Sequence, residues 1–266
     1  MKADLKLCRS LLFLPASNAR AIGKARGLGA DMVVLDLEDA VKPGAKDEAR
    51  AAAVAAAAEG FPGLCAIRIN SSEPWYEADI EAAAASRADY VVVPMTPGPE
   101  APLEAARATG KPVLAMIETA RGVLNAAATA RATAGLIAGT NDLAADLGLR
   151  PGGDRAALVT ALQTILLAAR AAGVAAFDGV YNRLDDPDGF AAQCEEGRSY
   201  GFDGKSLIHP SQIEPANRLF GPGEEEVEAA RRLVAAATGG AERFEGEMIE
   251  RMHVEQARRV LARARA

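Results

Sequence analysis

Short runs of apolar residues alternate with longer, alanine-rich stretches along most of this chain of 266 residues. The apolar runs are rich in Val, Ile and Leu and do not alternate regularly with polar residues, which is typical of parallel strands covered on both faces. We therefore predict eight strands. They cover residues 10–15, 32–37, 64–69, 90–93, 112–117, 135–138, 174–177 and 204–208.

The stretches between these strands are predicted to be helical, because alanine has the highest helix propensity. The helices cover residues 19–28, 46–59, 75–86, 101–109, 122–131, 154–172 and 187–200. Strand–helix repeats of this kind predict an α/β fold, a (β/α)8 TIM barrel, over residues 1–213. A doubly wound sheet is the alternative, but the first loop, residues 15–18, lacks the glycine-rich phosphate loop usual in that fold.

Residues 214–266 follow the last strand and are predicted to form a helical C-terminal extension. Gly221-Pro222-Gly223 and Gly239-Gly240 separate its helices, because glycine and proline end helices.

Composition and charge narrow the function. The chain has 36 acidic and 30 basic residues, and this balance argues against a nucleic-acid partner, which needs clustered Lys and Arg. The apolar runs fall short of the roughly 18 residues of a membrane span, so we expect no membrane partner. Three separate cysteines and two histidines predict no structural zinc site and suit a reducing, cytoplasmic location.

Polar residues gather at the carboxyl ends of the predicted strands, where barrel enzymes have their active sites. Glu118 and Asp142 are carboxylates on neighbouring strands and predict a Mg²⁺ site, because Mg²⁺ takes oxygen ligands and keeps positions for water or substrate. A 2-oxo acid could chelate those positions and have its carbonyl polarised. Arg68 would hold the substrate carboxylate. A salt-bridge network at the barrel rim is the alternative.

The segment after the second strand carries three further carboxylates. Alternation places Asp36 and Glu38 on one face and Asp39 on the other. Each of them could orient metal-bound water, support the metal ligands or pair with Arg68. An N-cap or a loop salt bridge is the alternative for each.

Three other residues have two readings each. Lys205 could form a Schiff base inside the barrel, although a lysine there is more often a salt-bridge partner or a phosphate contact. His209 either binds substrate or stabilises the turn before Pro210. His253 in the extension is expected to be structural or exposed.

Six segments, in this order, resemble the citrate lyase β-subunit-like family of the HpcH/HpaI aldolase superfamily. They are RSLLFLPASN, DMVVLDLEDAV, IRIN, AMIETARGV, GTNDLAADLG and GKSLIHPSQI. The resemblance covers nearly the whole chain, and the combination is much more specific than any one segment. It implies a (β/α)8 barrel with a C-terminal helical extension, assembled as trimers or hexamers, in which the extension reaches a neighbouring subunit.

The resemblance also implies an activity. It is the Mg²⁺-dependent cleavage or formation of a 3-hydroxy-acyl thioester, such as citryl-, malyl- or citramalyl-CoA, with an acyl-CoA and a 2-oxo acid as the cleavage products. By motif, Glu118 and Asp142 resemble the metal ligands, and Arg68 resembles the residue that holds the 2-oxo acid.

Further roles come from the same motifs. Glu38 and Asp39 resemble the polar pair that supports metal-bound water and substrate, and the backbone around Gly139 and Thr140 resembles a part that helps bind the substrate carboxylate. In many members an aspartate after a Met-Ile or Met-Val pair is supplied to a neighbouring subunit as the acid/base. The corresponding residue here is Glu250, which keeps the carboxyl group and adds a methylene.

A second departure is Met95 after Pro94, where the family often has lysine. The missing cation leaves the identity of the acyl group open. Two other functions remain compatible with these residues. One is a metal-dependent aldolase that acts on free 4-hydroxy-2-oxo acids to give pyruvate, and the other is a non-catalytic homologue that binds a 2-oxo acid.

Overall fold

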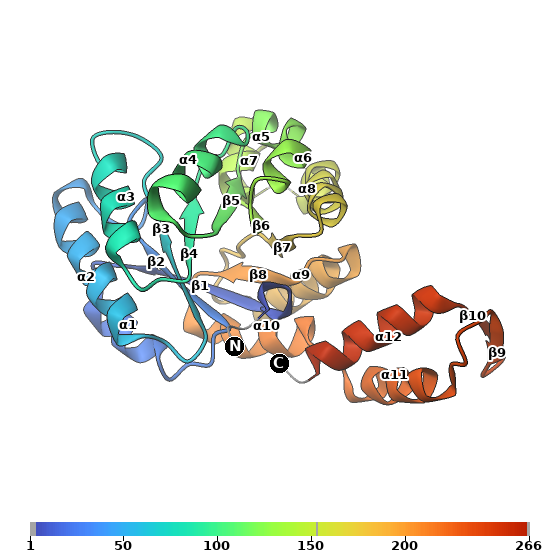
Figure 1. Cartoon of the computed structure of the whole chain (residues 1–266). Coiled ribbons are helices and arrows are strands. Elements are labelled where there is room, and N and C mark those ends of the chain that lie inside the picture. Colours follow the sequence, from blue (N-terminus) through green and yellow to red (C-terminus); the bar gives the residue numbers. More distant parts are fainter. Residues whose placement is uncertain (1–3, 153, 265–266) are drawn as a thin grey trace.

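A computed structural model describes residues 4–152 and 154–264. Eight parallel strands form a closed barrel in the order of the sequence, and helices surround it (Figure 1). The strands are β1 (Ser10–Pro15), β2 (Met32–Asp36), β3 (Leu64–Arg68), β4 (Tyr90–Val93), β5 (Val113–Ile117), β6 (Gly135–Ala138), β7 (Ala175–Asp178) and β8 (Gly204–Leu207). The predicted (β/α)8 fold is therefore confirmed.

The helices of the barrel differ in part from the prediction. They are α1 (Ala19–Ala25), α2 (Lys46–Glu59), α3 (Tyr76–Ala85), α4 (Glu100–Thr109), α5 (Ala120–Leu124), α6 (Ala126–Ala130), α7 (Thr140–Asp146), α8 (Val159–Ala172), α9 (Pro187–Tyr200) and α10 (Ile213–Phe220). One helix predicted over residues 122–131 is two, because the backbone of Asn125 leaves the helical region between α5 and α6. Short 3-10 turns precede β1, α2, α8 and α10, at Leu5–Leu7, Pro43–Ala45, Arg155–Leu158 and Pro210–Gln212.

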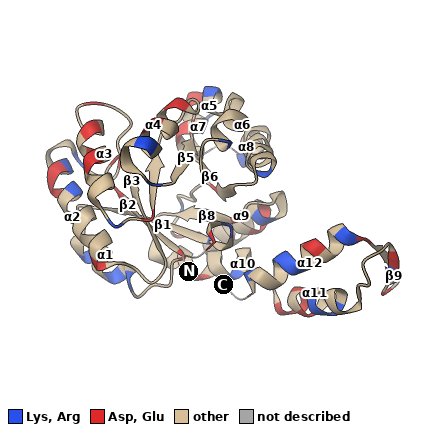
Figure 2. Cartoon of the chain, in the orientation of Figure 1, with Lys and Arg blue, Asp and Glu red and all other residues tan. Residues whose placement is uncertain are grey.

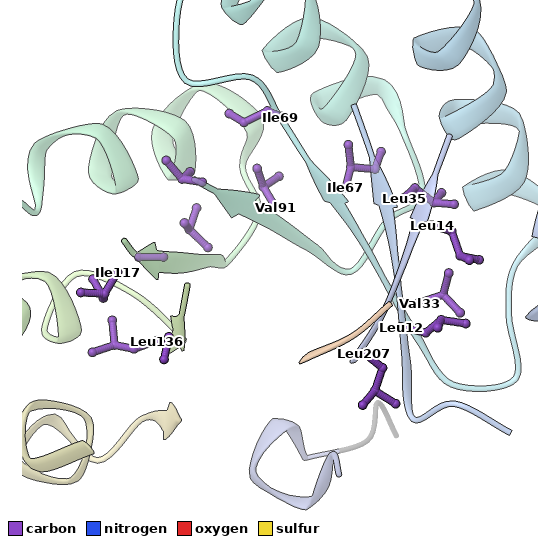
Figure 3. Packing of buried hydrophobic residues seen from close by; sticks show 14 of the residues in the cluster. Leu12, Leu14, Val33, Leu35, Ile67, Ile69, Val91, Ile117, Leu136 and Leu207 are labelled. Carbon is purple, nitrogen blue, oxygen red and sulfur yellow. The ribbon is translucent and has the colours of Figure 1, made fainter. Parts of the chain in front are cut away.

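The core has two layers, because successive side chains of a strand point alternately into and out of the barrel. The inner cluster includes Leu11, Val34 and Phe177. The outer cluster lies between strands and helices, and Figure 3 shows part of it, including Leu12, Val33, Ile67, Val91, Ile117, Leu136 and Leu207. Alanines such as Ala49 and Ala53 of α2 are completely buried there, so small side chains allow the helix to pack closely on the strands.

Along three strands the interior positions change from apolar at the bottom of the barrel to charged at its mouth. They are Met32, Val34 and Asp36 on β2, then Leu64, Ala66 and Arg68 on β3, then Leu114, Met116 and Glu118 on and just after β5. Because every second residue of a strand points inward, one strand places apolar side chains in the barrel interior and a charged side chain at its mouth.

The stretch Arg155–Ala172 is long and apolar enough, by length and composition, to cross a membrane. It consists of a 3-10 turn followed by α8. Leu162, Ile165 and Ala169 of this helix are buried in the outer core cluster. We therefore interpret it as a barrel helix, whose composition reflects its packing against the strands.

The C-terminal part forms an arm that extends away from the barrel (Figure 1). It consists of α11 (Glu224–Ala236), a hairpin of β9 (Glu242–Phe244) and β10 (Glu247–Ile249), and α12 (Arg251–Arg263). The hairpin corrects the prediction of a purely helical extension. Glu245 and Gly246 both have positive φ, which suits the tight turn of a two-residue hairpin.

The boundary predicted after residue 213 falls at the first residue of α10. That helix packs against α9, β8 and β1, and Ile213, Ala216 and Phe220 belong to the outer core cluster. In the structure the barrel therefore includes α10, and the arm begins at α11.

Candidate active site

A cavity of about 420 Å³ opens at the carboxyl ends of the strands. Seven of the residues singled out in the sequence line it: Asp36, Asp39, Arg68, Glu118, Gly139, Thr140 and Asp142, whereas Glu38 and Glu250 do not. Its apolar wall includes Phe13, Met116 and Val180. Four carboxylates line the cavity with one guanidinium, so its net charge is strongly negative.

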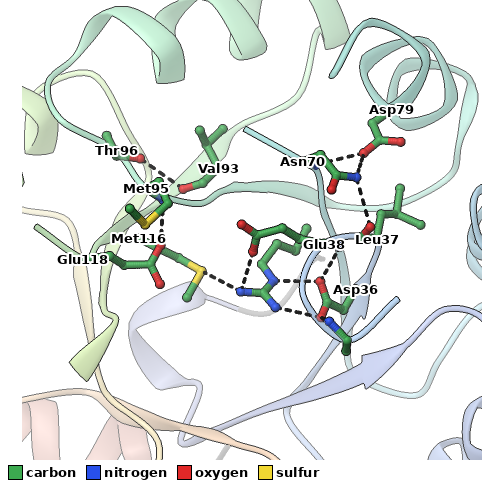
Figure 4. A network of polar contacts seen from close by, with 12 residues as sticks. Asp36, Leu37, Glu38, Asn70, Asp79, Val93, Met95, Thr96, Met116 and Glu118 are labelled. Atoms are coloured by element: carbon green, nitrogen blue, oxygen red, sulfur yellow. Dashed lines mark hydrogen bonds and ion pairs between the residues drawn. The ribbon is translucent and has the colours of Figure 1, made fainter. Parts of the chain in front are cut away.

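Arg68 is the centre of a buried ion-pair cluster, and its acidic partners Asp36 and Glu38 are labelled in Figure 4. Its Nε and Nη2 donate to the two carboxylate oxygens of Asp36, both at 2.7 Å, in a bidentate pair. Its Nη1 lies 2.8 Å from Oε2 of Glu38 and 3.9 Å from the sulfur of Met116. The contact with Glu38 is a charge contact without hydrogen-bond alignment, because Oε2 has no hydrogen-bond partner among the described residues.

This cluster settles part of the sequence interpretation. Arg68 pairs with Asp36 and Glu38, as the salt-bridge alternative predicts, and the edge formed by Nε and Nη2 is occupied by Asp36. Only the Nη1 side of the guanidinium faces the remaining cavity groups. The substrate-binding role of Arg68 stays a prediction, and any substrate carboxylate would meet a guanidinium already held in place.

Burial and charge act on the ionisation of the cluster in opposite senses. Burial alone would lower the pKa of Arg68, but Asp36 and Glu38 raise it overall. Burial raises the pKa of Glu38 to about 8, because the attraction of Arg68 does not compensate for lost hydration and for the nearby carboxylates. Glu38 is therefore a carboxyl group that can carry a proton near neutral pH.

Lys46 and Asn70 hold the loop that carries Glu38 and Asp39. The Lys46 ammonium donates to the carbonyls of Leu37 and Glu38, at 2.6 and 2.7 Å, and to the Asn70 side-chain oxygen at 2.8 Å. The Asn70 amide donates to the Leu37 carbonyl at 2.9 Å. Burial lowers the pKa of Lys46, and these acceptors replace the water that the ammonium has lost.

Glu118 follows β5 and is almost completely buried. Its Oε2 accepts a hydrogen bond of 2.6 Å from the backbone N–H of Met95, a residue with φ of 47°. On the other side, a Cβ atom at Gly139 would lie 2.2 Å from Cγ of Glu118, so only glycine leaves room for this carboxylate. Glu118 is thus positioned by the backbone of two neighbouring loops.

Asp142 lies in the first turn of α7, beside Glu118. Within the described ranges its carboxylate forms no hydrogen bond and no ion pair. Burial raises the pKa of Glu118 to about 7, the Met95 N–H and Arg68 oppose this, and Asp142 and Asp39 add to it. Two neighbouring carboxylates that repel each other match the donor set of Mg²⁺.

The described part of the chain contains no cluster of three or more His, Cys, Asp or Glu side chains suited to a metal ion. A Mg²⁺ site built on Glu118 and Asp142 would therefore leave its other positions to water and substrate. This small donor set fits Mg²⁺, which loses its water reluctantly and is usually bound by one or two carboxylates together with substrate oxygens.

Glu250 is not near this cavity. It directly precedes α12, whose other end is fixed at the bottom of the barrel, where Arg263 donates to the carbonyls of Lys6, Asp203 and Phe220. Thirteen helical residues separate the two ends, which is about 20 Å at 1.5 Å per residue. Within one chain Glu250 therefore cannot serve the mouth, and its predicted role requires a second subunit.

The residues with two readings are resolved by their contacts. Lys205 points away from the mouth and is completely buried, with Nζ 2.8 Å from Asp178 and 2.7 Å from Gln193. The Schiff-base interpretation is wrong, because β8 directs Lys205 outward. His209 accepts from the backbone N–H of Ser211, and His253 accepts from the N–H of Glu250, so both stabilise local turns.

Sequence reasoning missed the contributions of Met95 and Phe13. The Met95 contact is made by the backbone, for which the sequence carries no signal. Phe13 stacks its ring 5.4 Å from the Arg68 guanidinium. Its position two residues after the interior residue Leu11 would have predicted that it points into the barrel.

The chain is similar to known proteins over nearly its whole length. Residues 9–210 match the sequence model of the HpcH/HpaI aldolase/citrate lyase family. A (3S)-malyl-CoA thioesterase of Cereibacter sphaeroides (strain KD131) is 43% identical, covering 97% of this chain and 95% of that protein. The citrate lyase subunit beta of Leuconostoc mesenteroides is 35% identical over 98% and 94% of the two chains.

Solved structures agree with these sequence matches. CitE from Mycobacterium tuberculosis, in complex with magnesium, acetoacetate and coenzyme A, has a TM-score of 0.83 and 33% identity, covering 98% of this chain and all of that one. The citrate lyase beta subunit of the same organism, complexed with oxaloacetate and magnesium, has a TM-score of 0.75 and 33% identity, covering 83% of this chain and all of that one.

Proposed function

Because the chain belongs to the HpcH/HpaI aldolase/citrate lyase family, we propose that its barrel mouth cleaves or forms a carbon–carbon bond in a 3-hydroxy-acyl-CoA thioester with the help of Mg²⁺. The observation that carries the proposal is the pair of Glu118 and Asp142, two carboxylates that line one acidic cavity and repel each other. Two solved structures that are each 33% identical to this chain contain magnesium together with a small organic acid, acetoacetate in one and oxaloacetate in the other.

When bound by Glu118 and Asp142, Mg²⁺ would stabilise negative charge on substrate oxygen atoms. The chain's own residues supply positioning and proton transfer. Arg68 would attract the substrate carboxylate from its Nη1 side, and the first N–H groups of α7, at Thr140 and beyond, have no acceptor within the helix. Glu38, with a pKa of about 8, can accept the hydroxyl proton or return it near neutral pH.

In the cleavage direction the hydroxyl proton leaves, the bond between the hydroxyl-bearing carbon and the thioester α-carbon breaks, and the bonding pair stays with the thioester. The α-carbon then takes a proton from an acid. We assign this acid to Glu250 of a neighbouring subunit, because the arm leads away from its own barrel and ends in an exposed hairpin (Figure 1). The exposed side chains of Met248 and Met252 beside Glu250 favour a homotrimer or hexamer.

A groove beside the mouth suits the nucleotide end of coenzyme A. It measures about 480 Å³ and shares Phe13, Pro15 and Ile208 with the active-site cavity. Arg20 and Lys24 of α1 line it, and within the described ranges neither forms an ion pair, so both can bind phosphate groups.

The three buried, free cysteines suit a cytoplasmic enzyme.

Product analysis with (3S)-malyl-CoA and Mg²⁺ tests the proposal. Bond cleavage gives acetyl-CoA and glyoxylate, and we expect both in equal amounts. Glu118→Gln should abolish Mg²⁺ binding in calorimetry and lower turnover by roughly 10²–10³-fold, while circular dichroism stays unchanged. Unchanged Mg²⁺ binding in this variant would refute the metal assignment. Conversion of free 4-hydroxy-2-oxo acids, without turnover of any CoA thioester, would refute the thioester substrate.

A second function is favoured by the 43% identity to a malyl-CoA thioesterase. In that reaction water attacks the thioester carbonyl, and the products are free malate and coenzyme A. The same experiment separates the two functions, because acetyl-CoA appears only after carbon–carbon cleavage and free thiol only after hydrolysis.

Mixing Glu250→Gln with Glu118→Gln subunits should restore part of the activity if Glu250 acts across a subunit interface.

A further inference from the structure

A second cavity lies at the opposite end of the barrel from the active site. Its volume is about 720 Å³, and it lies between the amino ends of the last strands and the C-terminal part of α12. Five basic side chains line it, Lys6, Arg170, Arg198, Arg259 and Arg263, against two acidic ones, Asp4 and Asp203. Nothing in the proposed reaction uses this cavity.

Hydrogen bonds hold two of the guanidinium groups in this cavity, those of Arg170 and Arg263. Arg263 donates to three backbone carbonyls, of Lys6, Asp203 and Phe220. Arg170 forms a bidentate pair with Asp203, with both N–O distances at 2.9 Å. Their positions are therefore fixed before any ligand arrives, which lowers the entropic cost of binding.

Lys6 and Arg259 are the basic groups of the cavity that have no acidic partner among the described residues, because Arg198 is paired with Glu226 of α11 at 2.7 Å. Asp203 already serves both Arg170 and Arg263. Arg259 of α12 is exposed and forms no hydrogen bond or ion pair with any residue that the structure describes. Burial lowers the pKa of Arg263, and the neighbouring Arg9, Arg198 and Arg170 lower it further, against the attraction of Asp203. The cations repel one another, so an anion here would relieve that repulsion.

The floor of the cavity is apolar. Phe202, Phe220 and Val260 line it, and Phe202 and Phe220 belong to the outer core cluster. Arginines above an apolar floor match a ligand with two ends, one that carries several negative charges and one that is flat and apolar. Cavities of this volume accommodate small organic molecules.

We propose that this cavity binds a phosphorylated small molecule of nucleotide size, with its phosphate groups on Lys6 and Arg259, beside the fixed guanidinium groups, and its apolar end on Phe202 and Phe220. The guanidinium of Arg259 suits phosphate because its planar fork can donate two parallel hydrogen bonds. One wall belongs to α12 and the others to the barrel, and basic positions recur along α12 (Figure 2). The ligand would therefore tie the arm to the barrel.

Calorimetric titration of the full chain with ADP tests this site. We expect binding that weakens at least tenfold in Arg259→Ala and stays unchanged in Arg258→Ala, the adjacent exposed arginine of α12 that does not line the cavity. The double variant Arg20→Ala/Lys24→Ala removes the basic groove beside the active site. Retained ADP binding in this double variant places the ADP in the second cavity, independently of the proposed enzymatic function.

Pyrophosphate and adenosine test the contributions of the phosphate groups and of the apolar end separately. Pyrophosphate should bind more weakly than ADP and adenosine should not bind measurably, because the basic side chains supply most of the attraction. Hydrogen exchange of α12 should slow when ADP is present and should not slow in Arg259→Ala. ADP binding that is equal in wild type and Arg259→Ala, or that is lost in the Arg20→Ala/Lys24→Ala variant, would overturn the proposal.

Discussion

Two buried ion pairs in this barrel start from the same local arrangement. Asp36 on β2 lies in register with Arg68 on β3, and Asp178 on β7 lies in register with Lys205 on β8. Each pair joins adjacent parallel strands; Asp36, Arg68 and Asp178 end their strands, whereas Lys205 is the second residue of β8. The first faces the cavity at the mouth, whereas the second faces outward and contacts Gln193 of α9.

The two pairs differ in how charge is balanced. At the mouth, Arg68 is surrounded by more carboxylates than it can neutralise, so the site attracts a further cation. In the outward-facing pair, the Asp178 carboxylate contacts both Lys205, at 2.8 Å, and Arg155, at 2.6 Å. These two cations hold the pKa of Asp178 below its usual range although burial opposes them. The face of the strand, rather than the residue types, separates a functional pair from a structural one.

The largest expected effect is on the outer pair. Lys205→Met leaves Asp178 buried with one cation fewer, and we expect the free energy of unfolding to fall by about 3 kcal/mol. Urea denaturation measures this loss, with Lys42→Met, at an exposed position, as the control. The remaining folded enzyme should keep its kcat/KM, since Lys205 does not contact the mouth. A fall in kcat/KM without loss of stability would contradict the structural role.

The next effect is on the inner pair. Arg68→Lys keeps the charge but loses the planar fork, so one ammonium cannot hold both oxygens of Asp36 and also face Glu38. We expect kcat/KM for (3S)-malyl-CoA to fall by about 10²-fold, as for a misplacement near 1 Å. Arg50→Lys is the matched control, because Arg50 bridges Asp47 and Asp79 outside the cavity. Equal kcat/KM in both variants would show that the fork is dispensable.

Each cluster also depends on one glycine that makes room for a carboxylate. A Cβ at Gly139 would lie 2.2 Å from Cγ of Glu118, and a Cβ at Gly197 would lie 2.7 Å from Oδ2 of Asp178. Gly139→Ala should lower kcat/KM by roughly tenfold, and Gly197→Ala should lower the free energy of unfolding by about 1 kcal/mol. Gly44→Ala, with nothing within 4 Å of the new Cβ, serves as the control.

If Gly197→Ala changed kcat/KM as much as Gly139→Ala does, the proposed division of roles between the two clusters would be wrong. Stability and kinetics are therefore measured on the same preparations of all three variants.

The smallest effect concerns pH. Glu38 has a pKa of about 8 in the folded chain, against an ordinary value of 4.5. Between pH 6 and 7 the folded state holds this proton and the unfolded state does not, so stability falls as pH rises. The slope for one proton is about 1.4 kcal/mol per pH unit, and we expect Glu38 to contribute a loss of about 1 kcal/mol in metal-free protein. Glu118, with a pKa of about 7, adds a loss of the same sign, so Glu38→Gln should remove only the part that Glu38 contributes.

The outer pair behaves oppositely. The pKa of Asp178 is lowered, so its contribution is present above the ordinary pKa of an aspartate and is lost only as pH falls through its own, lower value. It contributes nothing to the change between pH 6 and 7. A pH dependence between pH 6 and 7 that stays unchanged in Glu38→Gln would contradict the raised pKa of Glu38, and one that persists in Glu38→Gln/Glu118→Gln would indicate another titrating group.

Much of the barrel could be predicted from the sequence because short apolar strands and alanine-rich helices repeat without interruption. The strands at Tyr90–Val93 and Gly135–Ala138 have the predicted bounds. The break at Asn125 was missed because Leu124 before it and the alanines after it all favour helix, and the arm hairpin because Glu245-Gly246 is a weak turn signal.

The site could be predicted in part. Strand alternation places Asp36 and Arg68 together, and it would also have placed Lys205 outside, since Ser206 lines the cavity. The N–H of Met95 on Glu118 depends on a backbone conformation that side-chain chemistry does not predict. The reach of Glu250 depends on a second chain, which the pattern of one chain cannot position.

The attachment of the arm has a consequence for how the protein tolerates change. Arg263 is held mainly by main-chain carbonyls, which every residue type provides. Lys6 can therefore vary in identity while its backbone still accepts the same hydrogen bond. These hydrogen bonds of α12 to the barrel all depend on one side chain of the arm, whereas α11 has its own contact with the barrel through Glu226 and Arg198.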